Sequence, residues 1–250
     1  MRRDVWLAVT VHDRAGRMVA GIEREADRLA SVFSGIAVAG TDQTHEAVFS
    51  ALAGCLPTVS ARHPPGEDTI GAARREAVGL ALEAGAAAVL YSDLDHLLRW
   101  IGADQTELEA CLDAETGAEV LVVGRSPAAF EASPARLRET ERLVNHVYEL
   151  MTGRDWDLMF AIRRLSRGAG RAIVEHCRED TIANDVVWPL LAERLGFSVG
   201  YLAAEGLSYL TTADFDQDVD RRDHDPRGWI QRIAIAAGHA HAMTAFLSTD

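Results

Sequence analysis

Apolar and polar positions alternate in blocks along the first half of the chain. Apolar runs rich in β-branched residues, each closed by polar or turn-forming residues, predict buried strands, and the segments between them have apolar residues at helical spacing. The strands are expected at 5–12, 35–42, 55–62 and 86–91, and the helices at 17–33, 44–54 and 69–85. This order predicts a largely parallel sheet with right-handed crossovers.

The second half of the chain is less regular. Strands are expected at 118–126 and 197–205, helices at 133–151, 182–196 and 225–247, and an acid-rich loop at 211–225. We therefore expect one α/β domain over 1–250, with three layers (α/β/α) around a mostly parallel central sheet.

Composition narrows the classes of partner. The chain has 250 residues, is 48% hydrophobic and has a formal net charge of −13, so it can bury a sizeable core but lacks the clustered cations that nucleic acids and anionic membranes require. All its fixed cations are arginines, which is typical of a GC-rich bacterial genome. No apolar run approaches the roughly 20 residues of a membrane-spanning helix. Cys55, Cys111 and Cys177 are widely spaced, which favours reduced thiols in the cytoplasm.

Two carboxylates follow the apolar run at 86–91. Asp93 and Asp95 stand at the carboxyl end of the expected strand, the edge at which open parallel sheets bind ligands. Residues two apart on a strand point the same way, so both carboxylates can reach one cation if the strand stays extended through Leu94. Oxygen ligands favour Mg²⁺ or Mn²⁺. The alternative is an acidic turn at which the strand meets solvent.

The context of these acids resembles a known family. A strand that ends in Asp-x-Asp directly after a helix such as "GAARREAVGLALEAGA" is similar to the GT-A glycosyltransferases, and the likeness spans roughly 5–209. The resemblance implies a Rossmann-like, nucleotide-diphospho-sugar transferase fold with a nucleotide-binding half (1–100), an acceptor-side half (101–210) and a C-terminal loop and helix (211–250). It also implies a divalent metal, Mn²⁺ or Mg²⁺, with Asp95 as the direct ligand and Asp93 facing the ribose or a metal-bound water.

The same resemblance assigns further residues to the donor site. The family's nucleotide-sugar-binding positions correspond to the end of the first strand, the acid after the second strand and the cation after the third. Arg74 or its neighbour Arg75 would neutralise the diphosphate. Arg74 is preferred because its spacing after Gly71 follows the family pattern. The other expected donor-site residues are His12, Asp13, Asp42 and Arg62.

On the acceptor side, "GRDWDLMFAIRRLSRGAGRAI" resembles a segment of the polyprenol-phosphate sugar synthases but lacks their serine-glycine pair. It implies that Trp156 and Asp157 lie near the acceptor. Asn184 and Asp185 stand where related enzymes often have Glu-Asp, which makes Asp185 the candidate catalytic base. An acid in the first turn of a helix is also stabilised by the helix dipole alone, and that dipole lowers its pKa.

A third metal ligand is a further expectation. Several GT-A enzymes complete the metal shell with a C-terminal histidine, and His224 in "RRDHDP" is the candidate here. His12 and His96 are alternatives for that ligand. A solvated loop histidine is the simpler explanation of His224.

The predicted function is therefore transfer of a sugar from a UDP- or GDP-sugar to a hydroxyl acceptor by a metal-dependent glycosyltransferase. Asp185 is the base if the reaction inverts the sugar configuration, and no base is needed if it retains it, as in mannosylglycerate synthase. The sequence leaves the oligomeric state open, a homo-oligomer included.

Three other classes compete with this prediction. A sugar-phosphate nucleotidyltransferase needs several glycines in its phosphate loop, whereas "AGRM" after the first strand has Gly16 alone. A haloacid-dehalogenase-like phosphatase has its acids on the first strand of the core. A non-catalytic nucleotide-sugar-binding protein on the same fold would bind the nucleotide without metal-dependent turnover.

Overall fold

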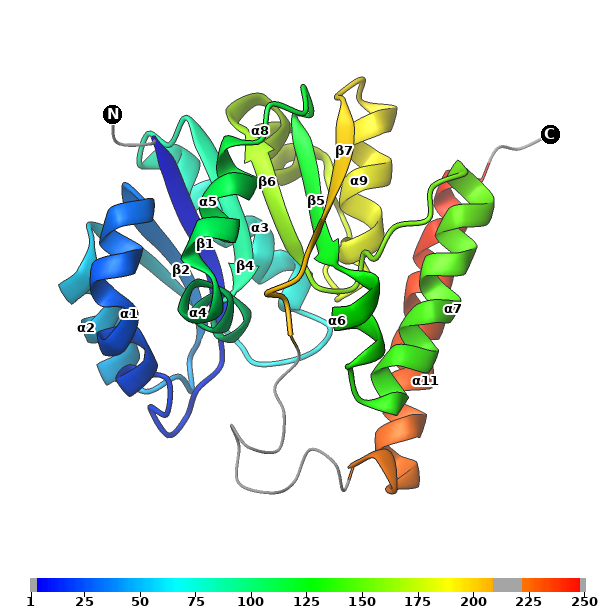
Figure 1. The fold of residues 1–250 in the computed structure, drawn as a ribbon, viewed down its shortest axis with the longest axis horizontal. Helices are drawn as coiled ribbons and strands as arrows, with labels where there is room; N and C mark the ends of the chain where they lie inside the picture. The colour runs from blue at the N-terminus through cyan, green and yellow to red at the C-terminus, as the bar shows by residue number, and fades with distance from the viewer. Residues whose placement is uncertain (1–3, 209–221, 248–250) are drawn as a thin grey trace.

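A seven-stranded sheet runs through the molecule in the order β3-β2-β1-β4-β6-β5-β7 (Figure 1). The computed structural model describes residues 4–208 and 222–247. The strands are β1 (Val5–Val11), β2 (Gly35–Thr41), β3 (Thr58–His63), β4 (Ala88–Asp93), β5 (Val120–Arg125), β6 (Ile162–Ser166) and β7 (Val199–Ala204). Paired strands are parallel except where β6 is antiparallel to β4 and β5. The expectation of a mostly parallel sheet is confirmed.

Helices cover both faces of the sheet, which confirms the three-layer arrangement. They are α1 (Val19–Val32), α2 (Glu46–Cys55), α3 (Ile70–Glu83), α4 (Leu94–Ala103), α5 (Gln105–Asp113), α6 (Pro127–Glu131), α7 (Ala135–Thr152), α8 (Arg167–His176), α9 (Asn184–Arg194) and α11 (Pro226–Met243), followed by the 3₁₀ turn η1 (Thr244–Phe246). One apolar core lies under α1, α2, α4 and α5, and a second lies under α3, α8 and α9. Both cores are built from alternate residues of the same strands, because successive strand residues point to opposite faces.

Two further helices stand beside the sheet. Figure 1 shows α7 and α11 side by side at the end of the molecule that is remote from β3. Both run in the same direction, because contacts early in α7 are made with residues early in α11: Arg136 lies against Gly228, and Glu141 accepts a hydrogen bond from Arg232. No described helix has both the length and the apolar composition that a membrane crossing would require.

The strand order reverses between β1 and β4, and this reversal positions the site. From β1 the chain builds β2 and β3 on one side and then returns to place β4 on the other side. Such a switch point leaves a crevice at the carboxyl ends of the two strands. Thr10 and Asp93 are register partners there, at the ends of β1 and β4.

The condition for both carboxylates to reach one cation from a strand, an extended backbone through Leu94, is not met. Strand β4 ends at Asp93, and Leu94 is the first residue of α4. Asp95 therefore lies in the first turn of a helix, and its position relative to Asp93 is not set by strand geometry. Of the expected acid-rich loop at 211–225, residues 211–221 lie outside the described residues.

Candidate functional site

A cavity of about 330 Å³ opens at the carboxyl ends of β1, β2 and β4. Strand ends and helix starts supply its polar lining, as the switch-point topology predicts. The polar lining residues are Thr10, His12, Thr41, His63, Arg74, Asp93, Asp95, His96, Glu141, Asp185 and Arg232. Four of them are donor-site or metal residues expected from the sequence, namely His12, Arg74, Asp93 and Asp95. Asp185 is the expected base.

Arg74 is the central cation of this cavity. Its Nη1 donates to Asp185 Oδ1 (2.5 Å) and to Asn184 Oδ1 (2.8 Å), and its Nη2 donates to Asp93 Oδ2 (3.2 Å). Burial lowers the pKa of Arg74, but the charges of Asp185 and Asp93 outweigh this and raise it above its ordinary value. The guanidinium therefore stays charged and joins the end of β4 to the start of α9. Arg75 points elsewhere and pairs with Asp180.

Gly71 allows Arg74 to reach this position. A Cβ on Gly71 would lie 2.5 Å from the carbonyl oxygen of Thr181, and the Gly71 amide donates to the carbonyl of Asp180 (2.7 Å). Because no heavy-atom contact of that kind is tolerated, a side chain here would push α3 away from the segment before α9. The sequence pattern of glycine followed three residues later by arginine thus has a physical basis.

Asp93 is fully engaged by the protein. Its Oδ1 accepts hydrogen bonds from Thr10 (2.7 Å) and Tyr91 (2.6 Å), while its Oδ2 accepts from Arg74. Burial raises the pKa of Asp93, but Arg74, His96 and the two hydroxyl donors outweigh burial and hold it below its ordinary value. Asp93 is therefore an ionised residue that fixes Arg74.

Asp95 differs from Asp93 in its protein contacts more than in its exposure, since the two side chains are 28% and 24% exposed. The Oδ2 atom of Asp95 lies 4.0 Å from the Nε2 atom of His96. The imidazole of His96 stacks on Phe160, with ring centroids 4.2 Å apart. Mg²⁺ and Mn²⁺ are commonly held by one or two carboxylates together with waters and substrate phosphates. Asp95 fits that requirement better than Asp93, whose oxygens already accept three hydrogen bonds.

Asp185 is buried between two partners. Besides Arg74, it has His239 of α11, whose Nε2 lies 3.7 Å from Asp185 Oδ2, and whose Nδ1 is 2.8 Å from the carbonyl oxygen of Ile235. Burial raises the pKa of Asp185, but Arg74 and then His239 lower it below its ordinary value. A carboxylate with a lowered pKa is a weak general base near neutral pH.

Glu141 and Arg232 form a second charged group on the cavity wall. Glu141 of α7 accepts hydrogen bonds from Arg232 of α11 (2.7 Å) and from the buried Arg125 (2.6 Å). Burial raises the pKa of Glu141 above its ordinary value, although Arg125 and Arg232 oppose this. The two side helices thus reach the cavity through an ion pair that the sequence analysis did not predict.

The expected acceptor-side residues line a different cavity. Asp157 and Trp156 contribute to a space of about 450 Å³ between α6, α7 and β7. The carboxylate of Asp157 accepts from Nε of Arg125 (2.7 Å), and the indole of Trp156 stacks on Tyr201 with centroids 5.4 Å apart. Arg125 lies between the two cavities, since it bonds both Asp157 and Glu141.

Three expected nucleotide-binding residues lie outside the lining of the first cavity. Asp13 is buried, and its carboxylate accepts from the amide of Met18 (2.8 Å), which fixes the loop after β1. Asp42 is exposed after β2. Arg62 stacks over the ring of Phe49 at 3.8 Å and pairs with Glu46.

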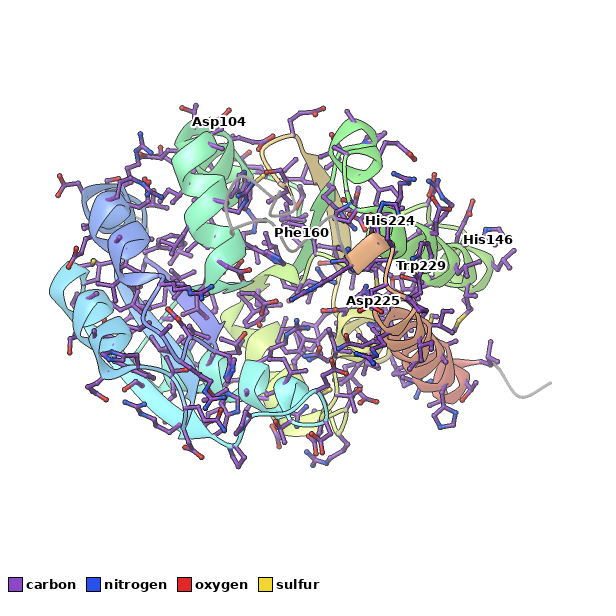
Figure 2. The ribbon with its side chains drawn as sticks, turned by 90° about the horizontal axis from the view of Figure 1, so that it is seen from below. Asp104, His146, Phe160, His224, Asp225 and Trp229 are labelled. Atoms are coloured by element: carbon purple, nitrogen blue, oxygen red, sulfur yellow. The ribbon has the colours of Figure 1, made fainter. Side chains whose placement is uncertain are left out.

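His224 is exposed and does not line the cavity. Figure 2 shows it with Asp225 at the start of α11, whereas Phe160 lies nearer the centre of the molecule. Within 4–208 and 222–247, no group of three or more histidine, cysteine, aspartate or glutamate side chains is arranged to hold a metal ion. His12 does line the cavity, with its Nδ1 2.8 Å from Thr41 Oγ1.

One backbone feature also marks the cavity. Ala161 lines it and has φ 54°, and it is the one non-glycine residue of the described chain with a positive φ. Such a conformation is costly for an L-residue and concentrates at functional sites. It lies just before β6, at the segment where the family resemblance departs from the polyprenol-phosphate sugar synthases.

Comparison with solved structures shows the fold. The chain is similar to glucosyl-3-phosphoglycerate synthase of M. tuberculosis, with a TM-score of 0.54, 12% identity, and coverage of 94% of this chain and 81% of that chain. The same enzyme in complex with UDP gives a TM-score of 0.54 at 12% identity, covering 93% and 80% of the two chains. Its complex with Mn²⁺, UDP-glucose and phosphoglyceric acid gives 0.52 at 12% identity, with the same coverage. The expected GT-A fold is confirmed.

At the level of sequence, no protein-family model matches the chain, and no curated protein matches it.

Proposed function

We propose that this protein is a metal-dependent glycosyltransferase that moves a sugar from a UDP- or GDP-sugar to a hydroxyl acceptor. The observation that carries the proposal is the bridge of Arg74 between Asp93 and Asp185, in a cavity at the switch point of a GT-A sheet. The similar M. tuberculosis enzyme, which binds UDP and UDP-glucose, supports a UDP-sugar donor.

The chemistry requires stabilisation of a departing diphosphate. Breaking the bond between sugar and phosphate builds negative charge on the leaving group, and preorganised cations stabilise that charge where it develops. Arg74 lines the cavity with 3% of its side chain exposed and is paired with Asp93 and Asp185. It would contact the diphosphate by exchanging one of these carboxylates for a phosphate oxygen.

A divalent cation fits the carboxylate that is not already occupied by the three hydrogen bonds made to Asp93. Asp95 would hold Mn²⁺ or Mg²⁺, while Asp93 would orient Arg74 and the ribose. When bound, the metal supplies Lewis-acid stabilisation of the diphosphate leaving group. His224 remains a proposed third ligand, which would require the segment before α11 to move toward Asp95.

Asp185 is proposed to position Arg74. Its lowered pKa and its contacts with Arg74 and His239 make it a weak base, so a retaining reaction, which needs no base, agrees better with the geometry. If the reaction inverts, Asp185 remains the candidate base and would have to exchange its contact with Arg74 for the acceptor hydroxyl.

The two halves of the domain keep separate roles in this proposal. Residues 1–100 would hold the donor nucleotide. His12 lines the cavity and would contact it, Asp13 would act by fixing the loop after β1, and Asp42 and Arg62 would reach the base from outside the cavity lining. Residues 101–210 face the acceptor, with Trp156 and Asp157 in the neighbouring cavity, and 211–250 complete the domain.

The test is release of a nucleoside diphosphate. The protein is incubated with UDP-glucose, GDP-mannose and related donors, with and without Mn²⁺, in the presence of phosphoglyceric acid and other small hydroxyl acceptors. We expect the parent to release a nucleoside diphosphate from one of these donors in a metal-dependent reaction, and the Asp95→Ala variant to release none. Binding without release would indicate a non-catalytic binding protein, and pyrophosphate release from a nucleoside triphosphate with a sugar phosphate would indicate a nucleotidyltransferase.

A further inference from the structure

One wall of the first cavity is built from the ends of β1, β2 and β3. Thr41 and His63 are register partners at the ends of β2 and β3, and His12 follows β1. These three side chains, the histidine wall, line the cavity together with Asp93 at the end of β4. The sheet order places them in a row, in which β3 lies three strand spacings, about 14 Å, from β4. A ligand that extends from Asp93 along this row meets His12 first and His63 last.

A chain of hydrogen bonds decides which nitrogen of His12 carries the proton. The hydroxyl of Thr44 has a single proton, which it donates to the carbonyl oxygen of Val11 (3.1 Å). Thr41 Oγ1 lies 3.0 Å from Thr44 Oγ1, so Thr41 is the donor of that pair. Thr41 then has no proton left for His12 Nδ1, 2.8 Å away, and accepts one from it. Neutral His12 therefore keeps its proton on Nδ1, and its Nε2 is a hydrogen-bond acceptor.

His63 has the same arrangement. Its Nδ1 lies 2.8 Å from the carbonyl oxygen of Pro64, which can only accept, so the proton is again on Nδ1. Its Nε2 atom is buried and has no hydrogen-bond partner among residues 4–208 and 222–247. The histidine wall thus offers two ring nitrogens that accept hydrogen bonds, while the single proton of the Thr41 hydroxyl is already used. The oxygens of a diphosphate also accept, so this wall suits a part of the ligand that donates.

We propose that the histidine wall binds the base of the nucleotide and selects a base with an N–H group in its six-membered ring. Uracil has this group at N3 and guanine at N1, whereas cytosine and adenine have a lone pair at the corresponding nitrogen. Two facing lone pairs leave both acceptors unsatisfied, which is costly in a buried contact. The inference rests on the proposed function, because it concerns the donor nucleotide. It orients that nucleotide with its base toward β3 and its diphosphate toward Arg74.

A metal ion is the other group that an unprotonated Nε2 can bind. The bond from His12 Nδ1 to Thr41 would suit a metal ligand, because ligating histidines donate their other N–H to a fixed acceptor. In the described ranges, however, His12 belongs to no group of three or more histidine, cysteine, aspartate or glutamate side chains that could hold a metal. The arrangement of the protein therefore favours the base over a metal as the partner of His12.

Isothermal titration with matched nucleotides tests the selection. UDP and CDP differ at N3 and at the substituent on C4, and inosine diphosphate and ADP differ in the same way at N1 and C6. In the presence of Mn²⁺, the parent should bind the member with the ring N–H about tenfold or more tightly, in whichever pair fits the site. The pair that fits separates uracil from guanine. Equal affinities within both pairs would overturn the inference and leave the proposed function standing, whereas no binding of any of the four would overturn both.

The variant His12→Gln tests the residue. The glutamine amide can turn either an acceptor or a donor toward the base, so the ratio of the two affinities should fall toward one. His12 is exposed, so the variant should fold, which circular dichroism verifies. The control is His176→Gln on α8, where the side chain is 49% exposed, and it should keep the ratio of the parent. An unchanged ratio in His12→Gln would contradict the assignment.

Two further measurements separate the base from the diphosphate and its metal. Inorganic pyrophosphate with Mn²⁺ should bind His12→Gln as tightly as it binds the parent. A parallel loss of pyrophosphate affinity would place His12 on the diphosphate or the metal and overturn the inference. In ¹⁵N NMR of the parent at about pH 8, where histidine is neutral, the His12 signals should show a protonated Nδ1 and an unprotonated Nε2. Their loss in His12→Gln assigns them, and a proton on Nε2 would contradict the proposal.

Discussion

Arg74 of α3 donates a hydrogen bond of 2.5 Å to Asp185 of α9, although 111 residues separate the two in sequence. Both side chains are buried, and the same guanidinium also reaches Asp93 at the end of β4. A buried ion pair of this kind gives little net stability, but loss of one partner leaves an uncompensated buried charge. The pair therefore fixes the cavity and makes it sensitive to single substitutions.

Replacement of Arg74 should be strongly destabilising. In Arg74→Gln, Asp93 and Asp185 lose their cation, and we expect the free energy of unfolding to fall by about 3–5 kcal/mol. Urea denaturation measures the change. The control is Arg142→Gln on α7, where both Arg142 (51% exposed) and its partner Glu131 (58% exposed) lie at the surface, and which should cost about 1 kcal/mol or less. Equal losses in the two variants would contradict the central role of Arg74.

A methyl group on Gly71 should disturb the packing of α3 against the segment before α9, and with it the contact between Arg74 and Asp185. Gly71→Ala places a Cβ 2.5 Å from the Thr181 carbonyl oxygen, so α3 must move, and we expect a loss of about 1–3 kcal/mol from overpacking. Gly79→Ala is the control, because its Cβ would meet its nearest neighbour, Val174, at 3.7 Å. That variant should gain up to about 1 kcal/mol from helix propensity. Thermal unfolding of both variants checks the prediction.

These residues show how much of the site the sequence predicts. The apolar blocks predict the sheet and place Asp93 and Asp95 at its carboxyl edge, because strand periodicity and strand ends are local properties. Arg74 is assigned by its spacing after Gly71, through the family resemblance. The helical spacing of Leu94, Leu97, Leu98 and Ile101 indicates a helix that begins at Leu94 and includes Asp95. Strand geometry applied to the Asp-x-Asp pair leaves this spacing out.

The remaining site residues depend on packing that one sequence does not encode locally. Glu141 and Arg232 lie on helices of ordinary amphipathic pattern, and they meet only because α7 and α11 pack side by side. Trp156 and Asp157 lie within a family-like segment, but Asp157 pairs with Arg125 and both residues line a second cavity. Tyr91 could have been found, since it lies two residues before Asp93 on the same face of β4.

Asp185→Asn distinguishes positioning from base catalysis. If Asp185 orients Arg74, the variant should bind the donor nucleotide about tenfold or more weakly, equivalent to about 1.4 kcal/mol, as well as turn over slowly. If Asp185 is only the base, the dissociation constant of the donor stays unchanged while turnover falls. Isothermal titration with the nucleoside diphosphate measures the first quantity. Asp180→Asn, an exposed acid before α9, should change neither.

The stability of the protein should fall steeply in acid. The pKa values of Asp93 and Asp185 lie below their ordinary values in the folded state. Their contribution is therefore present above the unfolded value of about 3.9 and is lost as the pH falls through the folded values. Urea denaturation between about pH 5 and pH 2.5 should show this loss, and Asp185→Asn should show a shallower dependence. A parent and variant with equal pH dependence would contradict the assignment.

The most direct measurement is thermal stability with UDP, GDP, CDP and ADP, with and without Mn²⁺, for the parent, Asp95→Ala and His224→Ala. A ligand at one hundred times its dissociation constant adds about 2.7 kcal/mol. We predict a Mn²⁺-dependent stabilisation by one of these nucleotides in the parent, lost in Asp95→Ala, while His224→Ala reports whether that histidine joins the site. The absence of any stabilisation in the folded parent would contradict a nucleotide-diphosphate site at Asp93, Asp95 and Arg74.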